Sequence, residues 1–104
     1  MTTPLELFQD LAAEHLHEPG VTFGRVWHND GLKVNGKVFA MFVRDRLVVK
    51  VPADRAAALR DEGRAVAFEP SPGRLMKEWI AVAPADPDLW RQLIVDARQH
   101  VAAR

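Results

Sequence analysis

The sequence contains no cysteine and no tyrosine, and it has a single serine, Ser71. Without cysteine the chain can form no disulfide, no thiolate nucleophile and no cysteine-ligated metal site. Ser71 lies between two prolines, and no histidine or aspartate is next to it in the sequence. Because a nucleophilic serine needs an adjacent base, this pattern does not indicate serine catalysis. We therefore expect no catalytic residue in this chain.

Phosphate-binding glycine loops and paired histidine ligands are also missing. The six glycines are isolated from one another, so neither of the common phosphate-cradling loops is present. His15 and His17 are two residues apart in a predicted helix, which points them about 200° apart and prevents shared chelation. We expect no cofactor and no metal. His28 is the least explained histidine, and polar groups converging on it would favour a small-ligand binder or an enzyme.

Long apolar runs and an excess charge of either sign are absent as well. No apolar run approaches the roughly 20 residues that cross a bilayer, and residues 1–6 do not read as a signal peptide, so we expect a cytoplasmic protein without membrane contact. The 14 basic and 14 acidic residues cancel. Proteins that depend on phosphate contacts usually have a basic excess, so nucleic-acid binding is allowed but not favoured. At 104 residues the chain is expected to form a single domain, residues 1–104.

Residues 31–51 have the clearest structural pattern, three short strands separated by two tight turns. Asn35-Gly36 is a preferred pair for a type I′ turn, because both central residues of that turn need a positive φ. Arg44-Asp45 offers a second turn about ten residues later. This pattern predicts a β-meander.

The two turns also predict the register and the faces of the meander. Simple alternation places one almost wholly apolar set of side chains on the face under the helices: Val38, Ala40, Phe42, Leu47, Val49 and Val51. The other face is then expected to carry Leu32, Val34, Phe39, Met41, Val43 and Val48, mixed with Lys37, Arg46 and Lys50. That second face is too apolar to be fully solvated. Another part of the chain, a second copy or a partner protein would cover it.

Helices are predicted at both ends of the chain and directly after the meander. Thr3 to Glu6 reads as a capping box that starts a helix extending to Pro19-Gly20. Residues 52–62 are an alanine-rich helix, and Asp86-Pro87 starts the last one, whose apolar stripe is Trp90, Leu93, Ile94, Ala97 and Val101. Further strands are expected at 21–28, 66–68 and 76–83. The order α-β-β-β-β-α-β-β-α predicts an α+β domain, with an antiparallel sheet built around the meander and helices packed on one face.

Several short segments, taken in order, carry a resemblance to known proteins: Gly24-Arg25, Gly31 to Lys37, Phe39-Ala40, Leu47 to Pro52 and Gly73 to Trp79. In this order and spacing they resemble the TfoX N-terminal-domain-like family (TfoX/Sxy) and, more distantly, the MmcQ/YjbR-like proteins. The resemblance covers nearly the whole chain and implies a single TfoX N-terminal-domain-like domain. For the first family it implies a regulatory role, known there as co-regulation of DNA uptake with the cyclic-AMP receptor protein. For the second it implies DNA binding.

Two surfaces follow as hypotheses. The first hypothesis is a non-catalytic regulatory or protein-interaction module, since tryptophan and arginine are favoured anchors of protein interfaces. Its expected surface consists of Arg74, Lys77, Trp79, Phe39 and Met41, its protein partner is unknown, and self-association into a homodimer stays open. The alternative is a DNA-binding protein whose meander contacts phosphates through Lys33, Lys37, Arg44, Arg46 and Lys50. A small-ligand binder or enzyme ranks below both.

Overall fold

The computed structural model describes residues 2–26, 28–68, 77–83 and 85–103, which form three helices and six strands. In chain order they are α1 (Pro4–Ala13), β1 (Val21–Val26), β2 (Asn29–Val34), β3 (Lys37–Val43), β4 (Arg46–Lys50), α2 (Ala53–Asp61), β5 (Val66–Ala67), β6 (Trp79–Val82) and α3 (Pro87–Ala102). The strands form one antiparallel sheet in the order β1-β2-β3-β4-β6-β5. The α+β class and the predicted element order are confirmed.

The helices begin where the sequence places their caps. Glu6 N donates to Thr3 Oγ1 at 3.1 Å and Thr3 N donates to Glu6 Oε1 at 3.3 Å, which completes the predicted capping box of α1. Asp86 Oδ1 accepts from Asp88 N and Leu89 N at the start of α3. The predicted stripe of α3 is buried throughout. The first helix, however, ends at Ala13, so His15 and His17 lie beyond it.

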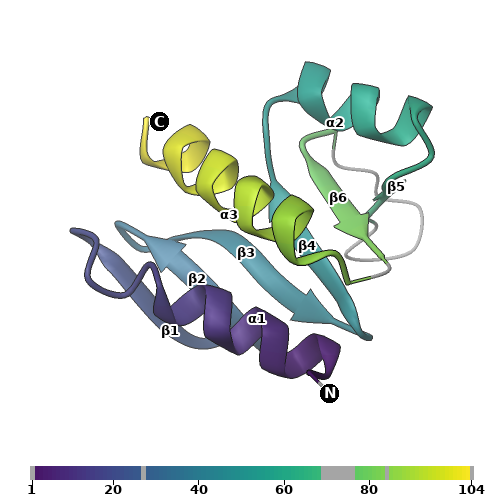
Figure 1. The fold of residues 1–104 in the computed structure, drawn as a ribbon. Coiled ribbons are helices and arrows are strands. Elements are labelled where there is room, and N and C mark those ends of the chain that lie inside the picture. Colours follow the sequence, from purple (N-terminus) through teal and green to yellow (C-terminus); the bar gives the residue numbers. More distant parts are fainter. Residues whose placement is uncertain (1, 27, 69–76, 84, 104) are drawn as a thin grey trace.

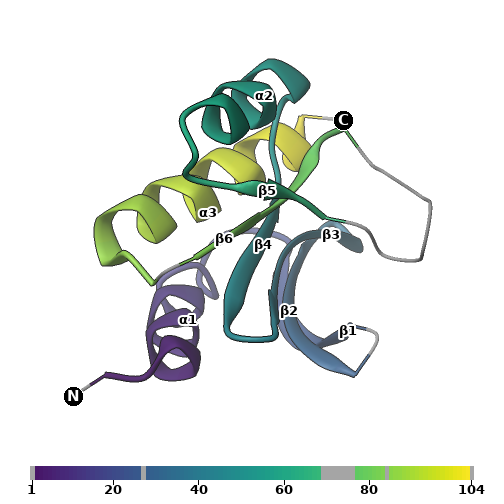
Figure 2. The same cartoon turned by 90° about the vertical axis from the view of Figure 1, so that its right-hand side faces the viewer.

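One layer of helices covers one face of the sheet. Figures 1 and 2 show α1 and α3 on the same side of the strands, with α2 near one end. Between them lies the main core, in which Phe8, Trp90 and Ile80 are fully buried. The ring of Phe42 lies 5.7 Å from that of Phe8 and 6.4 Å from that of Trp90, measured between centroids. Apolar contact between helices and sheet therefore holds the fold together.

Both predicted turns form, and each has the backbone of a primed turn. The central residues Asn35, Gly36, Arg44 and Asp45 all have φ between 52° and 81°. Val34 pairs with Lys37, and Val43 pairs with Arg46, so both loops contain two residues. The predicted pairs of Phe42 with Leu47 and of Ala40 with Val49 are confirmed.

A β-bulge corrects part of the predicted assignment of faces. Leu32 pairs with Ala40, but the next residue, Lys33, pairs with Val38, so Phe39 is an extra residue in β3. One extra residue reverses the alternation on one side of it. Leu32, Val34 and Phe39 therefore belong to the main core under the helices, and Val38 packs on the opposite face. The alternation prediction was wrong at these four positions.

The face opposite the helices carries its own apolar cluster, here called the second cluster. Its members are Val26, Met41, Val48, Trp79 and Ala81, with Val38, Val43 and Phe68 partly buried against them. Met41 and Val48 have no exposed surface, and Trp79 is 8% exposed. Because this burial is reached within one copy of the chain, no second copy or partner is needed to cover these side chains.

Candidate functional site

The structure does not place the expected protein-interaction residues on one surface. Phe39 is enclosed in the main core, and Met41 and Trp79 lie in the second cluster. Lys77 is exposed just before β6, and Arg74 lies outside the described residues. Because these three residues are buried, the prediction that Phe39, Met41 and Trp79 belong to an accessible surface was wrong. Simple alternation could not reveal this, because it says which side chains share a face but not what covers that face.

The meander cations, in contrast, keep access to solvent. Lys37 is exposed next to the first turn and Arg44 is exposed within the second, while Lys33, Arg46 and Lys50 are half-buried on the strands. The register places these last three on one face, because they pair with Val38, Val43 and Trp79 of the second cluster. Lys33 and Arg46 thus flank the buried centre of that face.

Most of the basic side chains on and around the helices are engaged by carboxylates, although Arg60 on α2 forms no ion pair among the described residues. Arg91 Nε and Nη2 donate to the two carboxylate oxygens of Glu14 at 3.3 and 3.4 Å, and this bond raises the pKa of Arg91 above its usual value. Arg98 lies 3.7 Å from Glu18. Each such pair cancels its own charge, so these arginines add little to the field around the protein.

On the meander, three cations have no such partner. Within the described part of the chain, Lys33, Arg44 and Arg46 form no ion pair. Lys50 is the exception, because its Nζ lies 4.0 Å from a carboxylate oxygen of Glu78. The zero net charge therefore conceals an uneven distribution, because three cations outside any ion pair lie on the β3–β4 hairpin and on β2, with Asp45 as the acidic residue between Arg44 and Arg46.

The span of these cations suits a polyanion. Lys33 and Arg46 pair with β3 residues that are five positions apart and lie on strands at either side of β3. Strand geometry then separates their Cα atoms by about 20 Å. Duplex DNA carries one phosphate per about 1.7 Å of its axis, so a surface of that length meets several phosphates at once.

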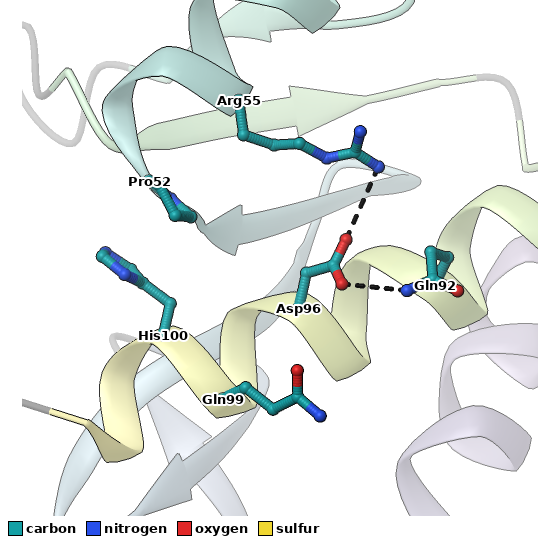
Figure 3. Close-up of a pocket in the computed structure, with 6 residues that line it drawn as sticks. All are labelled: Pro52, Arg55, Gln92, Asp96, Gln99 and His100. Atoms are coloured by element: carbon teal, nitrogen blue, oxygen red, sulfur yellow. Dashed lines mark hydrogen bonds and ion pairs between the residues drawn. The ribbon is translucent and has the colours of Figure 1, made fainter.

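A shallow groove lies between α2 and α3, lined by Pro52, Arg55, Gln92, Asp96, Gln99 and His100 (Figure 3). Asp96 accepts a hydrogen bond from Gln92 Nε2 at 2.9 Å, and Arg55 Nη2 lies 3.5 Å from its other oxygen. The ionic groups compensate each other, which leaves amide side chains as the main polar features. The sequence did not predict this groove, because α2 and α3 are far apart in the sequence and come together only in the folded chain. No local motif indicates a groove there.

At one end of the groove, His100 joins a polar chain that leads away from it. His100 Nε2 and Glu78 Oε2 are 3.1 Å apart, and the other oxygen of Glu78 faces Lys50. The imidazole thus ties the last turn of α3 to the residue before β6. Because the imidazole of His100 already contacts Glu78, we assign His100 a structural role.

The remaining histidines occupy contrasting environments. His15 is 6% exposed, and its ring meets that of Phe39 edge-on at 6.5 Å. Burial, and secondly the positive charge of Arg98, lowers the pKa of His15 below 6.5. His28 is exposed in the turn between β1 and β2 with a φ of 69°. His15 is therefore a packing residue.

The lowered pKa of His15 predicts acid sensitivity. The unfolded chain binds a proton near pH 6.5, whereas the folded chain binds it only at lower pH, so stability falls as pH drops through 6.5. His15→Leu is expected to reduce this loss, measured by urea unfolding at pH 7.5 and 5.5. His17→Leu, which removes an exposed imidazole two residues away, is the matched control, and His15→Leu should reduce the loss of stability more than this control does. Equal pH dependence in wild type and His15→Leu would contradict the assignment.

Comparison with known proteins places the chain in a family. The model of the YjbR family matches residues 16–100, which include all the strands and most of the helical core. The chain therefore belongs to the YjbR family, the more distant of the two families that its sequence resembles. No protein with a curated description matches it. Among the described residues, no helix is long and apolar enough to cross a membrane.

Proposed function

We propose that this YjbR-family protein is a non-catalytic DNA-binding protein that contacts phosphates through the cations of its meander. The observation that carries the proposal is the uneven charge distribution. Lys33, Arg44 and Arg46 have no carboxylate partner in the described structure, while Arg91, Arg98 and Arg55 each have one. A solvent-accessible cation without a partner is free to replace a counterion on DNA. Base contacts are no part of the proposal, so the binding is expected to depend weakly on sequence.

The proposal gives a quantitative salt dependence. Each phosphate contact releases counterions from the DNA. For three contacts, a plot of the logarithm of the binding constant against the logarithm of the salt concentration should have a slope of about −2.7. Affinity for a short labelled duplex should therefore drop about 40-fold between 50 and 200 mM salt. Fluorescence anisotropy of the labelled duplex measures both values.

Matched variants connect this binding to the meander. Lys33→Gln or Arg46→Gln should each reduce the slope by about 0.9, because one phosphate contact is lost. Arg60→Gln removes the same charge from a side chain that is equally half-buried and unpaired but lies on α2 instead of the meander, so it should leave the slope unchanged. The proposal fails if the wild-type protein does not bind at 50 mM salt, or if Arg60→Gln lowers the slope as much as the meander variants do.

The regulatory interpretation is compatible with this activity. A non-catalytic DNA-binding protein acts by occupying its site, and the resemblance to the TfoX N-terminal domain supports a regulatory use of that binding in the cytoplasm. A protein partner gains less support, since only Lys77 of its expected surface is exposed among the described residues. Co-regulation of the TfoX/Sxy type remains a prediction.

A further inference from the structure

The outer strand β1 has an accessible backbone edge. It ends the sheet on one side, and all four of its central residues, 22–25, are exposed (Figures 1 and 2). The Phe23 ring lies 6.4 Å from that of Phe8 between centroids, in a tilted arrangement, yet Phe23 is 41% exposed. The edge at the other side of the sheet, β5, has only two residues. An exposed six-residue edge strand is a template for pairing with another strand.

The alternation of hydrogen-bonded and non-hydrogen-bonded residues along β1 identifies which of its backbone groups face outward. Asn35 N donates to Gly20 O at 2.9 Å, which makes these two residues a hydrogen-bonded pair at the start of the β1–β2 ladder. Hydrogen-bonded and non-hydrogen-bonded pairs alternate along antiparallel strands. Thr22, Gly24 and Val26 therefore bond toward β2, whereas the N–H and C=O groups of Phe23 and Arg25 point away from the sheet.

We propose that β1 pairs antiparallel with β1 of a second copy, in a two-fold symmetric register that sets Gly24 opposite Gly24 of the partner subunit. In this register, Phe23 of each copy forms a hydrogen-bonded pair with the partner subunit's Arg25, and the two pairs satisfy all the outward groups of both residues. A register centred on Phe23 would need the N–H of Val21, which is already bonded to Glu18 O at 3.2 Å. The internal hydrogen bond thus selects between the two registers.

The side chains along this edge fit a second copy. Phe23 and Arg25 lie on the same face of β1, so each pairing places a guanidinium beside an exposed aromatic ring, where cation–π attraction operates. Arg25 lies 3.6 Å from Asp30 within its own copy, so two edges can approach without strong charge repulsion. A β-carbon added at Gly24 would meet no atom within 4 Å, and this leaves room at the symmetry axis.

A single engineered cysteine tests both the pairing and its register. The chain has no cysteine of its own, and Gly24 has no positive φ, so Gly24→Cys should fold normally. A non-hydrogen-bonded pair has Cα atoms about 4.5 Å apart, within the range that a disulfide bridges. Gly24→Cys should therefore become a disulfide-linked dimer under mild oxidation. Thr22→Cys, exposed on the same face, would be about 14 Å from its symmetry mate and should stay monomeric on denaturing gels.

Sedimentation of the unmodified chain supplies the independent measurement. The wild-type protein should sediment as a reversible dimer. Phe23→Lys should raise its dissociation constant at least about tenfold, because the two-fold symmetry makes each substitution alter two equivalent cross-strand pairs. Val66→Lys on the exposed β5 edge should leave the dissociation constant unchanged. A wild-type chain that stays monomeric at high concentration, or faster crosslinking of Thr22→Cys than of Gly24→Cys, would overturn the proposal. Neither result depends on DNA binding.

Discussion

Replacement of Trp79 by alanine is expected to lower the free energy of unfolding by about 3 kcal/mol or more, the usual cost of truncating a buried tryptophan. Trp79 begins β6, where it pairs with Lys50 and packs with Met41, Val48 and Ala81 in the second cluster. Its removal leaves a cavity on the face of the sheet opposite α1 and α3 (Figure 1). Urea unfolding followed by circular dichroism measures the loss.

Two controls separate this core role from a surface role. Trp79→Phe keeps most of the apolar volume and should cost much less than Trp79→Ala. Lys77→Ala changes an exposed side chain two residues earlier and should shift stability by no more than about 0.5 kcal/mol. If Trp79→Ala left the free energy of unfolding unchanged, Trp79 would belong on an accessible surface after all.

The β-bulge predicts an unequal pair of effects at neighbouring positions of β3. Phe39 is fully buried in the main core and packs against His15, whereas Val38 is only partly buried against the second cluster. Phe39→Ala should therefore cost about 3 to 5 kcal/mol. Val38→Ala should cost about 1 kcal/mol, because less apolar area is lost and solvent already reaches the site. Urea unfolding of both variants gives the comparison.

Unbroken alternation would reverse that order. It places Val38 under the helices and Phe39 outside, so Val38→Ala would then be the more damaging change. A larger loss for Val38→Ala than for Phe39→Ala would contradict the bulge. Both substitutions replace a good strand former by alanine, so they lower the β propensity by similar amounts. The difference between their free energies of unfolding therefore reports mainly on burial.

Local chemistry explains why much of the fold could be predicted from the sequence. The capping box at Thr3, the Asp86 cap and the Asn35-Gly36 turn each depend on residues within four positions, and all three form as expected. The stripe of α3 was also predicted completely, and every residue on it is buried in the main core. Leu5 and Leu16 lie within the first predicted helix but are 39% and 47% exposed, and Leu16 lies beyond Ala13, where α1 ends.

Features that depend on distant contacts could not be predicted in the same way. The bulge at Phe39 changes the register between β2 and β3, and no turn signal marks it. The burial of Met41 and Trp79 arises from packing between strands that are far apart in sequence. For the candidate site, the five cations were evident from the sequence, but which of them lack carboxylate partners depended on the fold. Glu78 illustrates this, because it reaches Lys50 only when β6 lies beside β4.

The proposed DNA binding depends on phosphate contacts by three meander cations, so the decisive measurement is the salt dependence of DNA binding by a triple variant. The variant combines Lys33→Gln, Arg44→Asn and Arg46→Gln, with asparagine chosen because it tolerates the positive φ of the turn. Measured beside the wild type by fluorescence anisotropy, its slope against the logarithm of salt concentration should move from about −2.7 to near zero. A folded triple variant that keeps the wild-type affinity and slope would contradict the proposed function.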